Sequence, residues 1–238
     1  LMALMKPDVR RRFEHVLLAT FNPALSPDAS VEKSPILPSV IDRLVAAGVV
    51  QPVGERDVQT AASGMAFCVV EEKAADDGSI ATRLRFIFWP RAHNTCLHAE
   101  YEVRVDLLRS SAYIDAVARE AAIVNDVENG FYGVVVPPRA RRFFRFRDAS
   151  GRLFHMARLP MGLVSSVELM HTLTKVIVGH PSVCAPQHVI CGGDVKADVF
   201  IDDFRAVGPS ASLAHAADAI AERCKRFCVP LKRRLEVV

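Results

Sequence analysis

Apolar residues recur along the chain at two spacings, one typical of helices and the other of strands. Helical spacing predicts helices over residues 6–20, 39–47, 105–121, 164–178 and 210–227. Gly48 follows the second of these segments, at a position where glycine often ends a helix. Strand-like runs cover residues 65–71, 80–89, 121–126, 141–148, 151–159, 198–208 and 231–238. The chain is therefore expected to combine short strands with helices.

Several of these strands are joined by short turns, and we expect them to form hairpins. The hairpin over residues 65–89 turns at AADDGS, and the one over residues 141–159 turns at DASG. A third lies within residues 198–208, where two short strands meet at adjacent acidic residues. Because helices and strands mix without a regular strand–helix–strand repeat, the pattern favours an α+β fold over a doubly wound sheet.

A connector rich in proline and serine divides the chain near its beginning. It covers residues 22–38 and separates an N-terminal arm, residues 1–38, from the main fold. We expect one domain over residues 39–121, which includes the hairpin 65–89, and another over residues 122–238. The chain starts at a leucine and stops in an apolar run, so it is expected to be part of a longer protein.

Composition narrows the protein class. The chain has 238 residues, of which 50% are hydrophobic, so it is long enough to bury a sizeable core. No apolar run approaches the roughly 18 residues of a membrane span, and the N-terminus lacks the pattern of a secretory signal. We expect a protein of the cytoplasm or nucleus that does not enter membranes.

The cations are clustered although the formal net charge is only +3. They gather at residues 10–12, 139–147 and 225–234, and most are arginines. Arginine's planar fork suits phosphate oxygens, so these clusters favour a nucleic-acid partner. The alternative, that each cluster is simply a solvated surface, is about equally favoured for each cluster alone.

The cysteines do not suggest a disulfide framework. Six are present in a chain without a secretory signal, which favours reduced thiols. His180, Cys184, His188 and Cys191 are close enough in sequence to raise the question of a zinc site. Their spacing fits no zinc-finger pattern, so an ordinary connecting loop is the favoured interpretation.

Carboxylates end two of the predicted strands. Asp202 and Asp203 lie within FIDDF, residues 200–204, and Asp126 ends the apolar run AAIVND. An acidic turn exposed to water would normally bring glycine or asparagine, which this turn lacks. Hard divalent cations prefer carboxylate oxygens, and Mg²⁺ commonly uses one or two of them together with substrate phosphates. The three acids are therefore candidate metal ligands.

These segments, in this order, resemble the reverse transcriptases of LTR-type and related (DIRS- or VIPER-like) retrotransposons. The similar motifs are Asp126-Val127-Glu128-Asn129-Gly130-Phe131, Leu159-Pro160-Met161-Gly162-Leu163-Val164, Phe200-Ile201-Asp202-Asp203, and Arg85, Arg91 and Asn94 within RFIFWPRAHN. The resemblance covers roughly residues 39–235, and several ordered matches are more specific than any one of them.

The resemblance implies a right-hand polymerase made of fingers and palm, with an antiparallel palm sheet backed by helices and no complete thumb. It implies that Asp126, Asp202 and Asp203 are catalytic and hold two Mg²⁺ ions, for which Mn²⁺ can substitute. The implied partners are an RNA template, a DNA primer, a dNTP and the remaining domains of a retrotransposon polyprotein. Lys232 is the residue in this scheme that would protonate pyrophosphate.

The resemblance also implies a set of substrate-binding residues. Arg85, helped by Arg83, would contact the triphosphate, and Phe131 would act as a steric gate against a ribose 2′-hydroxyl. The other members of the set are Arg91, Met161 and Gly162. Each of these side chains also has a purely structural interpretation: an exposed strand arginine, a loop-orienting polar group or a core aromatic.

Some positions depart from the family pattern, and two other functions stay open. Val167 stands where relatives usually have proline, Trp89 where many have an acid, and Met161 where retroviral enzymes have glutamine. An RNA-dependent RNA polymerase shares the palm and the paired acids, but Phe131 stands where it would need a ribose-binding polar residue. A non-catalytic nucleic-acid-binding relic is the third possibility, although all three acids are present. Phe143, Phe144 and Phe146 are candidates either for base stacking or for core packing.

Overall fold

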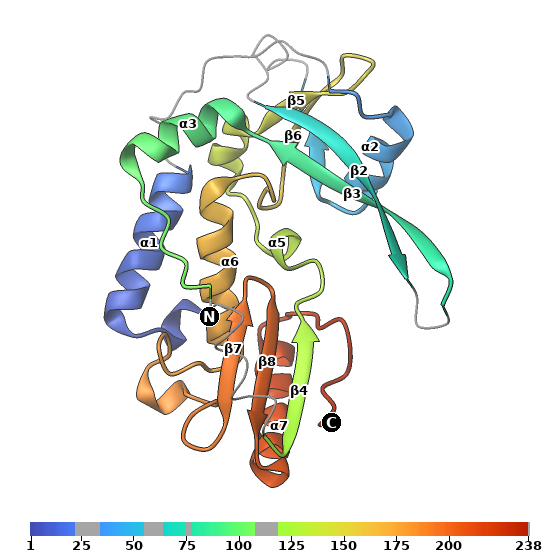
Figure 1. Cartoon of the computed structure of the whole chain (residues 1–238). Coiled ribbons are helices and arrows are strands. Elements are labelled where there is room, and N and C mark those ends of the chain that lie inside the picture. The colour runs from blue at the N-terminus through green and yellow to red at the C-terminus, as the bar shows by residue number, and fades with distance from the viewer. Residues whose placement is uncertain (22–33, 55–63, 75–77, 108–118, 238) are drawn as a thin grey trace. The chain divides into compact units, whose positions relative to one another are not determined.

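The fold is described by a computed structural model that covers residues 1–21, 34–54, 64–74, 78–107 and 119–237. The chain divides into two compact units, each built from separate stretches of sequence (Figure 1). The first unit comprises residues 1–18, 103–130 and 167–238, and the second comprises residues 19–102 and 131–166. These units interleave along the chain. The division expected from sequence, with an arm over residues 1–38, fingers over 39–121 and palm over 122–238, stays a prediction.

The helices and strands follow one another in the order labelled in Figure 1. The α-helices are α1 Pro7–Phe21, α2 Pro38–Ala46, α3 Arg91–Glu100, α5 Gly130–Gly133, α6 Val164–Ile177 and α7 Ser210–Arg226. The strands are β1 Val50–Pro52, β2 Met65–Ala74, β3 Ile80–Trp89, β4 Ala121–Asp126, β5 Arg145–Arg147, β6 Leu153–Met156, β7 Lys196–Phe200 and β8 Asp203–Gly208. Short 3-10 helices cover Met2–Leu4, Pro138–Phe143 and Pro186–His188.

The first unit is built around an antiparallel sheet in the order β4-β8-β7. One face of this sheet is buried and includes Ile123, Ala206 and Val199, and α7 packs on β4 and β8 (Figure 1). The helix buries Leu213, Ala217 and Ile220 among others, which its apolar spacing predicted. The opposite face is open, with Val124 64% exposed and Phe200 47% exposed.

A buried carboxylate joins the helices of the first unit. Glu168 on α6 receives Arg12 Nε at 2.7 Å and Arg12 Nη2 at 3.0 Å from α1. The same carboxylate accepts the Arg104 backbone N–H at 2.8 Å. The Glu168 carboxylate therefore links α6 to α1 and to the segment that contains Arg104.

The second unit contains a small sheet in the order β1-β6-β5 and a long two-stranded ribbon, β2-β3. Its core is aromatic. Phe146 lies 5.7 Å from Phe88, 6.0 Å from Phe86 and 5.9 Å from Phe154, measured between ring centroids. Rings at these separations pack with favourable tilted or offset geometry in addition to the area they bury.

The aromatic residues proposed as base-stacking candidates belong to this core. Phe143, Phe144 and Phe146 are all buried, with Phe144 and Phe146 0% exposed. Core packing was the correct alternative, because these rings are not accessible to a nucleobase. The strand expected over 141–148 is also shorter than predicted, because residues 138–143 form a 3-10 helix and only 145–147 pair with β6.

Other element predictions need correction. The helix expected over 105–121 is wrong at both described ends, because residues 101–107 have no regular structure and Ala121 begins β4; residues 108–118 lie outside the described part. The terminal strand expected over 231–238 is reduced to a single bridge between Leu231 and Val127 within the described residues. The apolar run AAIVND suggested a strand buried on both faces, but β4 is buried on one face only, since Val124 is exposed. Helix α3 was not predicted from the sequence.

The remaining predicted elements are confirmed. They are the helices α1, α2, α6 and α7, the ribbon β2-β3 and the hairpin β7-β8. Within the described residues, no helix combines the length and apolarity needed to cross a membrane.

Candidate active site

The acidic motif FIDD forms the turn of the β7-β8 hairpin. Phe200 is the last residue of β7 and Asp203 the first of β8, and these two residues are paired. Ile201 and Asp202 make the connection, and Ile201 has a φ of 61°. A β-branched residue in this left-handed region is a genuine outlier, so the turn is held in a strained conformation by its surroundings.

The strand β4 brings Asp126 to this turn. Asp126 is paired directly with Asp203 in the antiparallel register, so that both side chains project from the same, open face of the sheet. The backbone N–H of Val127 donates to the carbonyl oxygen of Asp202 at 3.0 Å. The three acids that the sequence singled out therefore lie together at one end of the first unit's sheet, although Asp126 is far from the others in the sequence.

The two oxygens of the Asp126 carboxylate have different surroundings. Lys232 Nζ donates to Oδ2 at 2.8 Å, whereas Oδ1 is buried and has no hydrogen-bond partner among the residues that the structure describes. A buried carboxylate oxygen without a donor is costly. Its position is suited to a cation, which fits the Mg²⁺ ligand role expected for Asp126.

The metal-ligand sets proposed from sequence are not complete clusters. In the described ranges, no group of three or more His, Cys, Asp or Glu side chains is gathered as a metal site. The three aspartates therefore do not form such a group, and their fit to Mg²⁺ rests on Asp126 and its pairing with Asp203.

The zinc candidates His180, Cys184, His188 and Cys191 do not form such a group either. Burial raises the pKa of the Cys191 thiol to about 12, which disfavours the thiolate that zinc would bind.

One residue that the sequence motifs did not include, His171, supports the turn. The backbone N–H of Ile201 donates to His171 Nδ1 on α6 at 3.4 Å, and burial, followed by the charge of Lys175, lowers the pKa of His171 to about 4. The ring is therefore neutral at physiological pH, as an accepting Nδ1 requires. The available signal was a histidine on the apolar face of the helix predicted over 164–178.

Gly130 lies against the same acids. A Cβ at this position would come within 2.9 Å of Met170 Cε and 3.2 Å of Asp202 Cβ. The absence of a side chain in the motif DVENGF thus lets the chain after β4 approach Asp202 closely. The sequence showed the glycine but not this neighbour.

The substrate-binding residues expected from the resemblance belong to the second unit. Arg83 and Arg85 project from the same face of β3, and Arg85 Nε lies 3.0 Å from Glu71 Oε1 on β2. Arg85 Nε has no hydrogen-bond partner among the residues that the structure describes, so this contact is an ion pair without a hydrogen bond. The Tyr132 hydroxyl donates to the carbonyl oxygen of Phe86, on the same strand as Arg85, at 3.0 Å. Burial is the main cause that raises the pKa of Tyr132 to about 12.

The LPMG segment is fixed to α3 within the second unit. Asn94 Nδ2 donates to the Gly162 carbonyl at 2.9 Å, and Asn94 Oδ1 accepts the Val164 N–H at 3.1 Å. A Cβ on Gly162 would collide with the carbonyl oxygen of Phe88. Asn94 therefore has the structural role that was the alternative to ligand binding, and Gly162 is required by close approach of β3.

The other expected binding residues have varied surroundings. The Arg91 guanidinium lies 5.7 Å from the centre of the Trp89 ring, a distance typical of a cation–π contact. Phe131 is 9% exposed and Met161 is half-buried. The expected gate, Phe131, is thus mostly enclosed by protein.

Comparison with solved structures relates this geometry to known proteins. The fold is similar to part of the fold of a foamy virus protease-reverse transcriptase. A crystal structure of the prototype foamy virus protease-reverse transcriptase CSH mutant, labelled with selenomethionine, matches 85% of this chain at 18% sequence identity, with a TM-score of 0.58. The native prototype foamy virus protease-reverse transcriptase matches 94% of the chain at 16% identity, with a TM-score of 0.57. The chain spans 24% and 30% of the length of those two proteins.

Sequence comparisons do not add to this relationship. No family model matches the chain, and no curated protein matches it. The likeness is therefore one of fold, and the LTR-type or DIRS-like subtype expected from the motifs stays a prediction.

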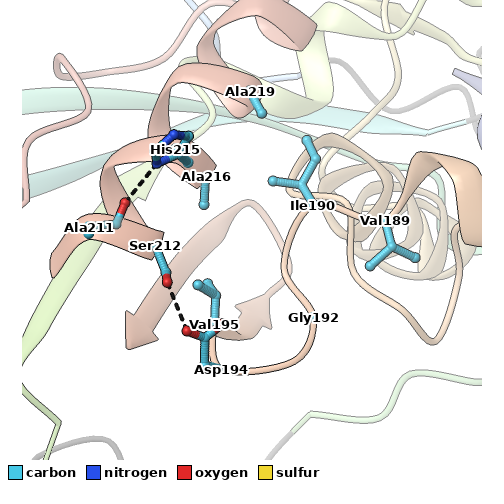
Figure 2. Close-up of a pocket in the computed structure, with 10 residues that line it drawn as sticks. All are labelled: Val189, Ile190, Gly192, Asp194, Val195, Ala211, Ser212, His215, Ala216 and Ala219. Carbon is cyan, nitrogen blue, oxygen red and sulfur yellow. Dashed lines mark hydrogen bonds between the residues drawn. The ribbon is translucent and has the colours of Figure 1, made fainter. Parts of the chain in front are cut away.

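An open pocket lies at the other end of the first unit's sheet (Figure 2). It has a volume of about 500 Å³ and is lined by Val189, Ile190, Gly192, Asp194, Val195, Ala211, Ser212, His215, Ala216 and Ala219. Two of the lining residues are joined, because Ser212 Oγ donates to Asp194 Oδ2 at 2.8 Å. Because these residues precede β7 and follow β8, the pocket lies at the opposite end of both strands from the Ile201-Asp202 turn.

Proposed function

We propose that this chain is the fingers and palm of a reverse transcriptase of the LTR-type or a related retrotransposon. The proposed activity is RNA-directed and DNA-directed DNA polymerisation, in which a primer 3′-hydroxyl attacks the α-phosphate of a dNTP. The observation that carries the proposal is the direct pairing of Asp126 with Asp203 beside the Asp202 turn, with one buried Asp126 oxygen left without a donor. The fold likeness to foamy virus protease-reverse transcriptase supports it.

The carboxylates would bind and orient the catalytic cations. When bound, two Mg²⁺ ions would activate the primer hydroxyl and stabilise the departing pyrophosphate, and Mn²⁺ would substitute. In this proposal Asp126 and Asp202 are the main ligands, and Asp203 adds negative charge beside them. The strained turn at Ile201 would hold Asp202 in position, because the backbone N–H of Ile201 donates to His171 Nδ1.

Residues of the second unit would bind the nucleotide. Arg83 and Arg85 offer two guanidinium groups on one strand face for the triphosphate. Phe131 would exclude a ribose 2′-hydroxyl, and Gly162 and Met161 would support the nucleotide together with Arg91. The template and primer backbones would be held by exposed cations without sequence readout.

Primer extension on an RNA template with Mg²⁺ tests the proposal. We expect extension with dNTPs and a loss of about a hundredfold or more in rate for Asp126→Asn and Asp202→Asn. Asp198→Asn is the matched control, because Asp198 lies on the same open sheet face and pairs with Arg205 at 2.7 Å instead. Its extension rate should stay near that of the unaltered chain.

Each contrary outcome points to a different function. Preferential use of NTPs would indicate that the chain is an RNA polymerase and would overturn the proposal. Binding of primer–template without any extension, in both Mg²⁺ and Mn²⁺, would favour a nucleic-acid-binding relic. Equal loss in the Asp198→Asn control would show that the effect is one of folding.

A further inference from the structure

The chain after α7 returns to the candidate active site and attaches to the end of β4. The Glu128 N–H donates to the Pro230 carbonyl at 2.9 Å, and the Lys232 N–H donates to the Asp126 carbonyl at 3.0 Å. Asn125 Nδ2 donates to the Arg233 carbonyl at 2.9 Å. Residues 230–233 thus run beside the edge of β4 that β8 does not occupy, and backbone contacts fix their register.

This register places a cation on the candidate metal ligand. Lys232 Nζ lies 2.8 Å from Asp126 Oδ2, and the two side chains are 42% and 24% exposed. On the other side of Asp126, β8 presents Asp203 directly opposite. Two like charges opposite each other on neighbouring strands are destabilising, and the ammonium group supplies an opposite charge within the same row.

The ammonium group neutralises only part of the site. It donates to Oδ2, whereas Oδ1 stays buried without a hydrogen-bond partner in the part of the chain that the structure describes. A Mg²⁺ ion demands near-octahedral oxygen ligation at about 2.0–2.1 Å. A cation that used Oδ2 would have to share or replace the Lys232 contact.

We propose that Lys232 is an internal counter-ion of Asp126, which holds this carboxylate in the metal-free protein and competes with the divalent cation for it. The inference rests on the proposed metal-binding role of Asp126. Lys232 is accordingly a positioning residue. It stabilises the site when no metal is bound and lowers the affinity of the site for a divalent cation. A purely structural role is distinguishable, because the backbone contacts of residues 230–233 would persist without the Lys232 side chain.

Direct titration of Mn²⁺ tests the competition. Binding to the nucleotide-free protein is measured by calorimetry, with Mn²⁺ alone as the probe, for the unaltered chain and for Lys232→Met. Exposed ion pairs contribute about 0.2–1 kcal/mol, so loss of the competitor should tighten Mn²⁺ binding about 1.5- to 5-fold. Asp126→Asn should weaken binding in both backgrounds.

A matched variant separates competition from a general charge effect. Arg234→Met removes the same charge from an exposed residue two positions along the same segment. We expect it to change Mn²⁺ affinity by a clearly smaller factor than Lys232→Met. Equal factors for the two variants, or weaker binding by Lys232→Met, would overturn the proposal.

A second measurement does not use metal. Chemical denaturation in EDTA gives the unfolding equilibrium constant of the unaltered chain, Asp126→Asn, Lys232→Met and the double variant. Lys232→Met should raise the unfolding constant about 1.5- to 5-fold more in the unaltered chain than in the Asp126→Asn background. The same effect in both backgrounds would show that the pair is not coupled and would refute the counter-ion role.

These outcomes are separable from those of the polymerase proposal. Measurements of Mn²⁺ binding and of unfolding require neither primer nor dNTP. The counter-ion role of Lys232 is therefore supported if both measurements give the expected results, even where primer extension fails. If extension succeeds but Lys232→Met behaves like Arg234→Met, the counter-ion role alone is rejected.

Discussion

At the residue scale, single side chains determine the geometry of the candidate site. The sequence pointed to three acids at the ends of strands, and the structure places Asp126 opposite Asp203 beside Asp202, while their catalytic role stays a prediction. It did not identify the supports, since His171, Gly130 and the strain at Ile201 depend on neighbours that are distant in sequence. Motif order predicts which residues gather, whereas hydrogen-bond partners require the folded chain.

The strain at Ile201 predicts a stabilising substitution. Glycine adopts a φ of 61° without steric cost, so Ile201→Gly should raise the free energy of unfolding by about 0.5–1 kcal/mol. Ile80 is a control, because it is β-branched, exposed and in a regular strand. Ile80→Gly should instead cost about 1 kcal/mol in the same denaturation experiment.

Burial of His93 predicts a pH-dependent stability. Burial lowers the pKa of His93 to about 4 from its ordinary 6.5, and the ring is 0% exposed beside Phe144. Below pH 6.5 the unfolded chain binds a proton that the folded chain takes up only near pH 4, so stability falls across this interval. The expected share of His93 at pH 5 is about 2 kcal/mol.

The His93 contribution is measured by comparing unfolding free energies at pH 7 and pH 5 in the unaltered chain and in His93→Phe. The variant should lose about 2 kcal/mol less on acidification, whatever its stability at pH 7. His171, whose pKa is also about 4, provides an independent and similar share that the variant retains. An unchanged pH dependence in His93→Phe would contradict the prediction.

At the element scale, the confirmed predictions are those with clear periodicity. Helices α1, α6 and α7 and the two hairpins β2-β3 and β7-β8 agree with their apolar spacing. The misses have a common reason, since α3, the 3-10 helix Pro138–Phe143 and the segment 101–107 are fixed by tertiary contacts such as those of Asn94 and Arg104. Such contacts leave no periodic signal in the sequence.

The Glu168 carboxylate predicts a large stability effect. Glu168→Gln would remove the negative charge that pairs with the Arg12 guanidinium and weaken the hydrogen bond from the Arg104 N–H. The expected loss is about 2–3 kcal/mol in the free energy of unfolding. Glu14→Gln is the control, because Glu14 pairs with Arg10 on the exposed side of the same helix and should cost less than about 0.5 kcal/mol.

Close approach of the LPMG turn to β3 predicts intolerance at Gly162. The Cβ of Gly162→Ala would collide with backbone atoms of Phe88, which cannot move without disturbing β3. We expect a loss of about 3 kcal/mol or more in unfolding free energy. Gly133→Ala, where a Cβ meets nothing within 4 Å, should be nearly neutral in the same assay.

At the scale of the whole molecule, the basic clusters of the sequence differ in how far their cations are paired, buried or exposed. Arg10 and Arg12 are paired with acids, and Arg145 is buried. Lys225 and Arg226, in contrast, are exposed at the end of α7. Charge counting along the sequence could not separate these cases, because pairing and burial depend on the tertiary structure.

The exposed cluster predicts the salt dependence of nucleic-acid binding. If Lys225 and Arg226 contact phosphates, the double variant Lys225→Gln/Arg226→Gln should reduce the slope of log K against log salt by about 1–2. Arg10→Gln should leave the slope unchanged, because Arg10 is paired with Glu14. Fluorescence anisotropy of a labelled primer–template at several salt concentrations distinguishes the two results.

The order of Asp126 and its partners along the chain has a consequence for synthesis. Asp203 follows Asp126 by 203 − 126 = 77 residues, and Lys232 follows it by 106. At ribosomal speeds of about 5–20 residues per second, roughly 4–15 s pass before Asp203 is made, and longer before Lys232 is made. A nascent chain therefore carries Asp126 before either Asp203 or the Lys232 ammonium group is present, and the centre forms only after residue 232 has been made.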